Sequence, residues 1–185
     1  WMRVTTVMSA INKRHAVEFT EQQDPVIAEA GSLWQVMLDE VREQATDEPV
    51  LASFFHATIL NHKSLASALS FLLASKLDSP VVSNMLIREI IEEAIQSDPS
   101  ICNGAEIDIK AIKSRDPACD NYSTPFLYYK GFHALQTYRV AHWLWNQDRR
   151  ALAWFMQNQM STIFGVDIHP AARIGCGIML DHATS

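Results

Sequence analysis

Cysteine is scarce in this chain, and no long apolar run occurs anywhere in it. The three cysteines, Cys102, Cys119 and Cys176, are widely spaced and form no C-x-x-C pair, which argues against a disulfide framework and a structural zinc site. Unpaired thiols suit a reducing cytosol, so we expect a cytoplasmic protein. Because no stretch of about 18 apolar residues is present, we expect no membrane-spanning helix and no membrane partner.

Positive charge is limited as well. The 15 Lys and Arg residues are outnumbered by 21 Asp and Glu, and the formal net charge is −6. No basic stripe stands out, so nucleic acid is not an expected partner. The scattered Arg and Lys are expected to lie on solvated helix faces. None of the histidines has a second histidine four residues away, so we expect no metal site.

Most of the chain has the pattern of helices, and 48% of its residues are hydrophobic, which is enough to form a core. Asp24 is the predicted N-cap of the first helix, with Pro25 at its first position. Apolar spacing and proline-containing turns predict helices at residues 24–46, 50–60, 65–77, 81–97, 99–113, 126–147 and 149–164. The last two are rich in aromatic residues, which we expect in the core and at subunit contacts.

Residues 166–185 have a different pattern. Two sets of residues recur there at six-residue spacing: Ile168, Ile174 and Leu180, and Ala172, Ile178 and Thr184. This hexapeptide period is typical of a parallel β-helix, in which each hexapeptide forms a short strand and a turn. Three hexapeptides, about 18 residues, close one coil, and the sequence contains that much of the pattern. A single coil has no neighbour against which to bury its inner face.

Three long motifs occur in a fixed order. They are RDPACDNYSTP, YYKGFHALQTYRVAHWLWNQDRRALAWFMQNQ and VDIHPAARIGCGIMLDHAT. Together they resemble bacterial serine acetyltransferase, from about Leu33 to Thr184. The resemblance implies an enzyme of cysteine biosynthesis that transfers acetyl from acetyl-CoA to the hydroxyl of L-serine. It also implies a trimeric left-handed β-helix behind an α-helical domain, with two trimers forming a hexamer.

The fold class that follows is mainly α, with the first coil of a truncated left-handed parallel β-helix. We expect a variable leader at 1–30, an α-helical domain at 31–165 and the coil at 166–185. The resemblance implies further coils that bind coenzyme A, and a C-terminal tail that binds O-acetylserine sulfhydrylase. Neither is in these 185 residues, so we expect little activity from them alone. The alternative function is a non-catalytic α-helical oligomerisation module.

The proposed chemistry needs a base, because the hydroxyl of serine is a poor nucleophile at neutral pH. Histidine suits this role, and a carboxylate at its second ring nitrogen fixes the tautomer. By the resemblance, His182 is the catalytic base and Asp167 the carboxylate that orients it. Asp181 and Asp116 match the acids that bind the serine ammonium, and acetyl-CoA is the co-substrate. The residues alone, without the resemblance, favour Asp116 as an N-cap before Pro117.

Overall fold

The computed structural model describes residues 24–183, and helices are the only regular elements within that range. They are α2 (Pro25–Ala30), α3 (Leu33–Asp47), η1 (Pro49–Leu51), α4 (Ala52–Phe55), the π-helix η2 (His56–Leu60), α5 (Leu65–Leu77), α6 (Asn84–Ser97), α7 (Ser100–Arg115), α8 (Ser123–Tyr128), α9 (Lys130–Asn146) and α10 (Arg150–Phe164). The predicted mainly α class is confirmed. Residues 1–23 of the predicted leader and Thr184 of the hexapeptide pattern lie outside the described residues.

The helix predicted at 24–46 is two helices. Asp24 is the N-cap of α2, as predicted, and accepts a hydrogen bond from the Val26 N–H at 3.0 Å. Gly31 then ends α2 with a φ of 80°, a left-handed conformation that glycine adopts without steric cost. Ser32 begins α3 and accepts from the Gln35 N–H at 3.1 Å. The break follows from a glycine and a capping serine standing next to each other.

The helix predicted at 81–97 begins later, at Asn84. The Ser79 hydroxyl accepts from the Val82 N–H at 3.0 Å, and the Asp78 carboxylate accepts from the Asn84 N–H at 2.7 Å. Because these side chains satisfy the backbone donors, residues 78–83 form a turn in place of a helical start.

The helix predicted at 126–147 is also interrupted. Tyr129 has an extended backbone, with φ −83° and ψ 109°, between α8 and α9. Its N–H still bonds to the Pro125 carbonyl at 3.2 Å. The kink turns the Tyr129 side chain toward the end of α7, where its hydroxyl donates to Asp116.

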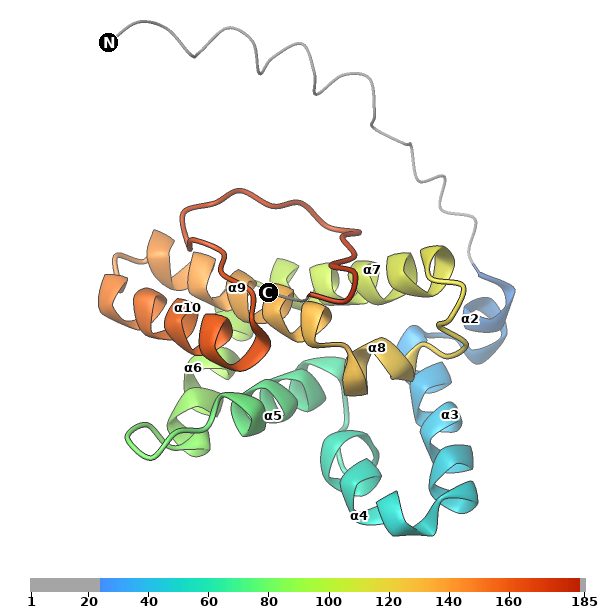
Figure 1. The fold of residues 1–185 in the computed structure, drawn as a ribbon. Helices are drawn as coiled ribbons and strands as arrows, with labels where there is room; N and C mark the ends of the chain where they lie inside the picture. Colours follow the sequence, from blue (N-terminus) through green and yellow to red (C-terminus); the bar gives the residue numbers. More distant parts are fainter. Residues whose placement is uncertain (1–23, 184–185) are drawn as a thin grey trace, which may run out of the picture.

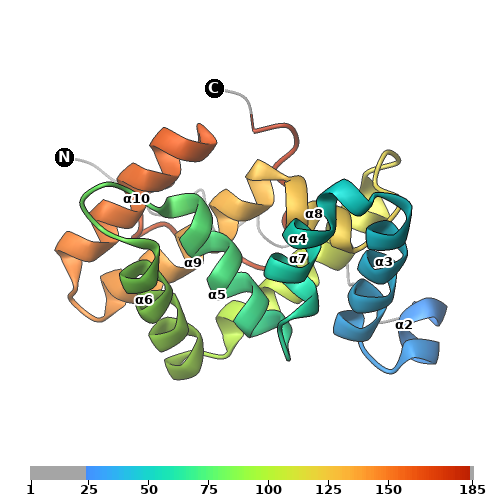
Figure 2. The ribbon, with the colours of Figure 1, turned by 90° about the horizontal axis from the view of Figure 1, so that it is seen from below.

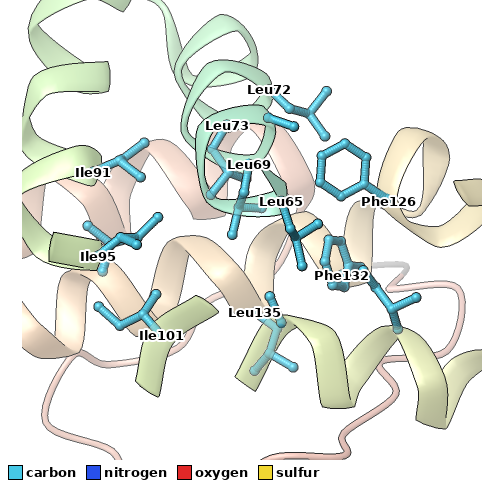
Figure 3. Close-up of a cluster of buried hydrophobic side chains, with 14 of the residues drawn as sticks. Leu65, Leu69, Leu72, Leu73, Ile91, Ile95, Ile101, Phe126, Phe132 and Leu135 are labelled. Carbon is cyan, nitrogen blue, oxygen red and sulfur yellow. The ribbon is translucent and has the colours of Figure 1, made fainter. Parts of the chain in front are cut away.

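Helix α5 lies at the centre of the core. It is apolar on nearly all sides, as expected for a helix surrounded by others. Figure 3 shows its leucines, Leu65 and Leu69 among them, facing Phe126 of α8 and Phe132 and Leu135 of α9. Figures 1 and 2 show α6 and α10 toward one end of the molecule and α2 and α3 at the other, with α5 between them. No helix in residues 24–183 is long and apolar enough to cross a membrane.

His133 is a buried histidine in α9, with 1% of its surface exposed. Its Nε2 donates to the Phe126 carbonyl at 2.6 Å, so this nitrogen carries the proton. Burial, with a smaller contribution from the charge of Lys76, lowers the pKa of His133 from 6.5 to about 3. The ring is therefore neutral in the folded protein at neutral pH.

This buried ring predicts acid destabilisation. The unfolded chain binds a proton at His133 near pH 6.5 and the folded chain does not. The stability is therefore complete above that pH and is lost as the pH falls toward 3. We expect the free energy of unfolding in urea to fall by about 1 kcal/mol per pH unit between about pH 6 and pH 4 from this group. His133→Gln keeps a donor for Phe126 but does not titrate, so its slope should be smaller; equal slopes would contradict the assignment.

Candidate active site

The segment after α10 contains three of the four predicted site residues. Gly165 ends α10 in the left-handed conformation, with φ 68°. Figure 1 shows residues 166–183, in red, turning back from the end of α10 and running across α9 and α7. This segment forms no strand or helix within the described residues. Its position is therefore set by what it touches on those two helices.

Two side chains of α9 bind the backbone of this segment. The Tyr138 hydroxyl donates to the Ala172 carbonyl at 2.5 Å and accepts from the Ile174 N–H at 3.3 Å. His142 Nδ1 lies 2.6 Å from the Pro170 carbonyl. Because a carbonyl only accepts, Nδ1 carries the proton, and Nε2 accepts from the Asn146 amide at 3.1 Å.

A buried ion pair holds the next part of the segment. Asp108 of α7 has no exposed surface, and its Oδ2 accepts from the Arg139 guanidinium at 2.7 Å and from the Gln136 amide at 2.9 Å. Its Oδ1 accepts from the Ile178 N–H at 2.9 Å. The same Arg139 nitrogen donates to the Gly175 carbonyl at 2.9 Å. A buried carboxylate is tolerated only when it is paired in this way.

One expectation from the sequence is wrong here. The Arg side chains were predicted to lie on solvated faces, but Arg139 is only 8% exposed. The reason is that residues 166–183 cover the face of α9 that would otherwise be solvated. At the end of α7, Arg115 donates to the Gly177 carbonyl at 2.7 Å. We call Asp108, Arg115, Tyr138, Arg139 and His142 the backbone clamp.

Asp181 and His182 stand exposed just beyond the clamp. The His182 Nε2 lies 3.6 Å from Asp181 Oδ1, and the two side chains are 85% and 65% exposed. His182 and Ala183 have positive φ values of 53° and 43°. This turn leaves the histidine and the adjacent carboxylate exposed to solvent.

Asp167 lies at the other end of the segment. It is exposed, and its Oδ1 accepts from the Gln157 amide of α10 at 2.7 Å. Among residues 24–183 there is no hydrogen bond between Asp167 and His182. The side chains of the consecutive residues Asp181 and His182 lie near each other, while the pairing of His182 with Asp167 stays a prediction.

Asp116 follows the last residue of α7, in the polar turn before α8. Its Oδ1 accepts from the Ala118 N–H at 2.9 Å and its Oδ2 from the Tyr129 hydroxyl at 3.0 Å. Burial and this bond to Asp116 raise the pKa of Tyr129 to about 12. Asp116 is the C-cap of α7, and the next helix, α8, begins only at Ser123, so the alternative that Asp116 is an N-cap is wrong. Its carboxylate stabilises a turn and remains half-exposed.

Metal ligands do not gather in the described part of the chain. Residues 24–183 contain no group of three or more His, Cys, Asp or Glu side chains placed to hold a metal ion. The arrangement offers instead an exposed imidazole with a carboxylate beside it, which is suited to moving a proton.

The family is decided by comparison with known proteins. A family model described as the N-terminal part of serine acetyltransferase matches residues 33–137, more than half of the chain. The chain belongs to the serine acetyltransferase family. The resemblance noted from the motifs is thereby confirmed.

The relatives agree with this assignment. Serine acetyltransferase of Escherichia coli K12 is 60% identical over 152 residues, which are 82% of this chain and 56% of that protein. The enzyme of Haemophilus influenzae is 59% identical, over 82% of this chain and 57% of its own length. The chain thus spans a little over half the length of these curated relatives.

Solved structures match the fold as well. A serine acetyltransferase in complex with CoA has a TM-score of 0.81 and 58% identity, covering 82% of this chain and 64% of that one. The serine acetyltransferase of Neisseria gonorrhoeae in complex with serine has a TM-score of 0.81 and 53% identity, covering 83% of this chain and 64% of its own.

The backbone clamp was missed from the sequence, although one signal for it was present. In α7, Asp108 falls at helical spacing among apolar residues, in line with Ala105 and Ile112. A carboxylate on the apolar face of a helix indicates a buried polar partner. That partner, Arg139, lies on α9, and nothing in the local pattern identifies it.

The ion pair predicts a large loss of stability on truncation. Asp108→Ala leaves the Arg139 guanidinium buried and without its carboxylate, so the free energy of unfolding in urea should fall by about 3 kcal/mol or more. Asp39→Ala is the matched control, because the Asp39–Arg42 pair is more than half exposed and should contribute less than about 1 kcal/mol. Similar small losses in both variants would show that the buried pair is not structurally important.

Proposed function

We propose that this chain provides the helical domain and the base of a serine O-acetyltransferase. The enzyme transfers the acetyl group of acetyl-CoA to the hydroxyl of L-serine, which gives O-acetyl-L-serine for cysteine biosynthesis. The observation that carries the proposal is the exposed His182 beside Asp181, in a chain of this family. It is supported by relatives solved in complex with CoA and with serine.

His182 is the general base in this proposal. Its imidazole takes the hydroxyl proton as the serine oxygen attacks the thioester carbonyl carbon. The carbon–sulfur bond then breaks, and the imidazolium returns the proton to the leaving coenzyme A thiolate. Asp167 orients the ring once residues 166–185 close into the first β-helix coil, exchanging its present bond to Gln157. No metal is needed for these steps.

Two carboxylates bind the substrate ammonium in this scheme. Asp181 stands beside the base, and Asp116 lies in the turn between α7 and α8. Each Asp116 oxygen accepts one hydrogen bond, from Ala118 or Tyr129, and a carboxylate oxygen has a second lone pair for an ammonium donor. The negative charges also suit the cationic end of serine.

We assign the helical domain to residues 31–165 and the first coil of the left-handed β-helix to 166–185, after a leader at 1–30. The left-handed Gly165 at the end of α10 supports the second boundary. The resemblance assigns the coenzyme A site to coils later than residues 166–185, and the chain spans 56% of the length of the E. coli enzyme. The 185 residues alone should therefore have little activity.

The test is the substitution His182→Ala in the complete enzyme that contains this chain. Loss of a general base should lower kcat by about 10²–10⁴-fold, measured as release of the coenzyme A thiol with L-serine and acetyl-CoA. Asp167→Asn should also lower kcat by a large factor, but by less than His182→Ala does. His169→Ala is the control, since His169 is an exposed histidine of the same segment whose Nδ1 accepts from the Ala171 N–H and whose ring packs edge-on against Trp145. Near-normal turnover of His182→Ala would refute the assignment.

An oligomerisation module is the second candidate function. Val81, in the turn before α6, is 90% exposed, and Met85 and Leu86, in the first turn of α6, are 66% and 52% exposed. Clustered apolar surface is more often covered by another subunit than left in water. We propose that the helical domain supplies one contact of the hexamer, a dimer of trimers.

Light scattering after size exclusion tests this second function. The chain should elute as an assembly larger than its monomer mass of 20.9 kDa. The double variant Met85→Lys/Leu86→Lys should shift the population toward the monomer, whereas Val26→Lys, an exposed position on α2, should not. A monomer at tens of micromolar for the unaltered chain would refute an assembly role.

A further inference from the structure

The chain makes direct backbone contact with α9 just before Asp181 and His182. Gly131 is the second residue of α9, and Leu180 lies directly over it. An ideal Cβ on Gly131 would overlap the Leu180 carbonyl oxygen and lie 2.9 Å from the Leu180 Cβ. Contacts that short do not occur between real side chains, so only glycine permits the observed path.

The residues leading to this contact are held by the backbone clamp. His142 and Tyr138 bind the carbonyls of Pro170 and Ala172. Farther along, Arg139 and Arg115 bind those of Gly175 and Gly177, and Asp108 binds the Ile178 N–H. The contacts therefore run from residue 170 to residue 180 without a long gap. The segment has no strand bonds of its own to fix its position.

These contacts link the position of His182 to helices α7 and α9. We propose that Gly131 and the backbone clamp are positioning elements, which hold residues 170–180 on α7 and α9 and so fix the place from which Asp181 and His182 project. The inference rests on the proposed function, because it assigns the base to His182. None of these residues is proposed to touch the substrate.

The clamp itself is tested in the 185-residue chain by hydrogen exchange. The Ile178 amide donates to a buried carboxylate, so it should exchange slowly although it lies outside any helix or strand. Asp108→Ala should remove this protection. Fast exchange of Ile178 in the unaltered chain would overturn the clamp, whatever the reaction of the enzyme.

The positioning is tested in the complete enzyme by Gly131→Ala. The added methyl must push Leu180 away, and a displacement of about 1 Å at a reacting group can cost about 10²-fold in rate. We expect kcat to fall by about 10²-fold while the KM for acetyl-CoA stays within about twofold. Alanine is a better helix former than glycine, so α9 itself is not weakened.

Two companion variants separate positioning from folding. Lys130→Ala changes the exposed residue next to Gly131 and should keep normal kcat and KM. Tyr138→Phe keeps the ring but loses the bonds to Ala172 and Ile174, and it should lower kcat with KM unchanged. If kcat fell and KM rose to the same extent in Gly131→Ala and in Lys130→Ala, the cause would be a general folding defect, and the positioning role would be overturned.

The outcomes also separate this inference from the proposed function. Normal kcat in Gly131→Ala together with inactive His182→Ala overturns the positioning role and leaves the base assignment standing. Normal kcat in both variants overturns both. A fall in kcat in both variants, with KM unchanged for Gly131→Ala, supports both.

Discussion

The buried ion pair between Asp108 and Arg139 is the interaction on which the C-terminal part of the structure depends. A charge without exposed surface is costly unless every oxygen is paired. Here one oxygen takes the guanidinium and the other the N–H of Ile178, while Arg139 also reaches Gly175. Both oxygens of Asp108 are thus paired, and the same two side chains hold the backbone of residues 166–183 at Gly175 and Ile178. Removing either partner would leave a buried charge without its counter-ion, and residues 166–183 would lose a hydrogen bond to the helices.

The division between buried and exposed polar groups follows from this arrangement. Three clamp residues, Asp108, Tyr138 and Arg139, are buried between α7, α9 and the segment, while His142 is half-buried and Arg115 is exposed. Asp181 and His182 lie one step beyond and are exposed. A base must reach its substrate, whereas the groups that place it work best in a dry, rigid setting. The helical domain therefore does more than support the segment: it sets the location of the proposed chemistry.

Much of the fold was predictable from the sequence, because apolar spacing and proline turns are local signals. The predicted helix boundaries differ from the structure where the conformation of one residue ends a helix, at the left-handed Gly31 and at the extended Tyr129. Asp116, Asp181 and His182 came from family motifs, not from spacing. Arg139 was misjudged because its burial depends on residues more than thirty positions away, which no local pattern reports. The β-helix coil at 166–185 stays a prediction, since no strand forms within residues 166–183.

Mass spectrometry of the product identifies the atom of serine that receives the acetyl group. The complete enzyme containing this chain would be incubated with L-serine and acetyl-CoA labelled in the acetyl group. We expect the label to appear in O-acetyl-L-serine, with one coenzyme A thiol released for each ester formed, and His182→Ala to form almost none. Label on the serine nitrogen, or no transfer to serine by the unaltered enzyme, would contradict this expectation.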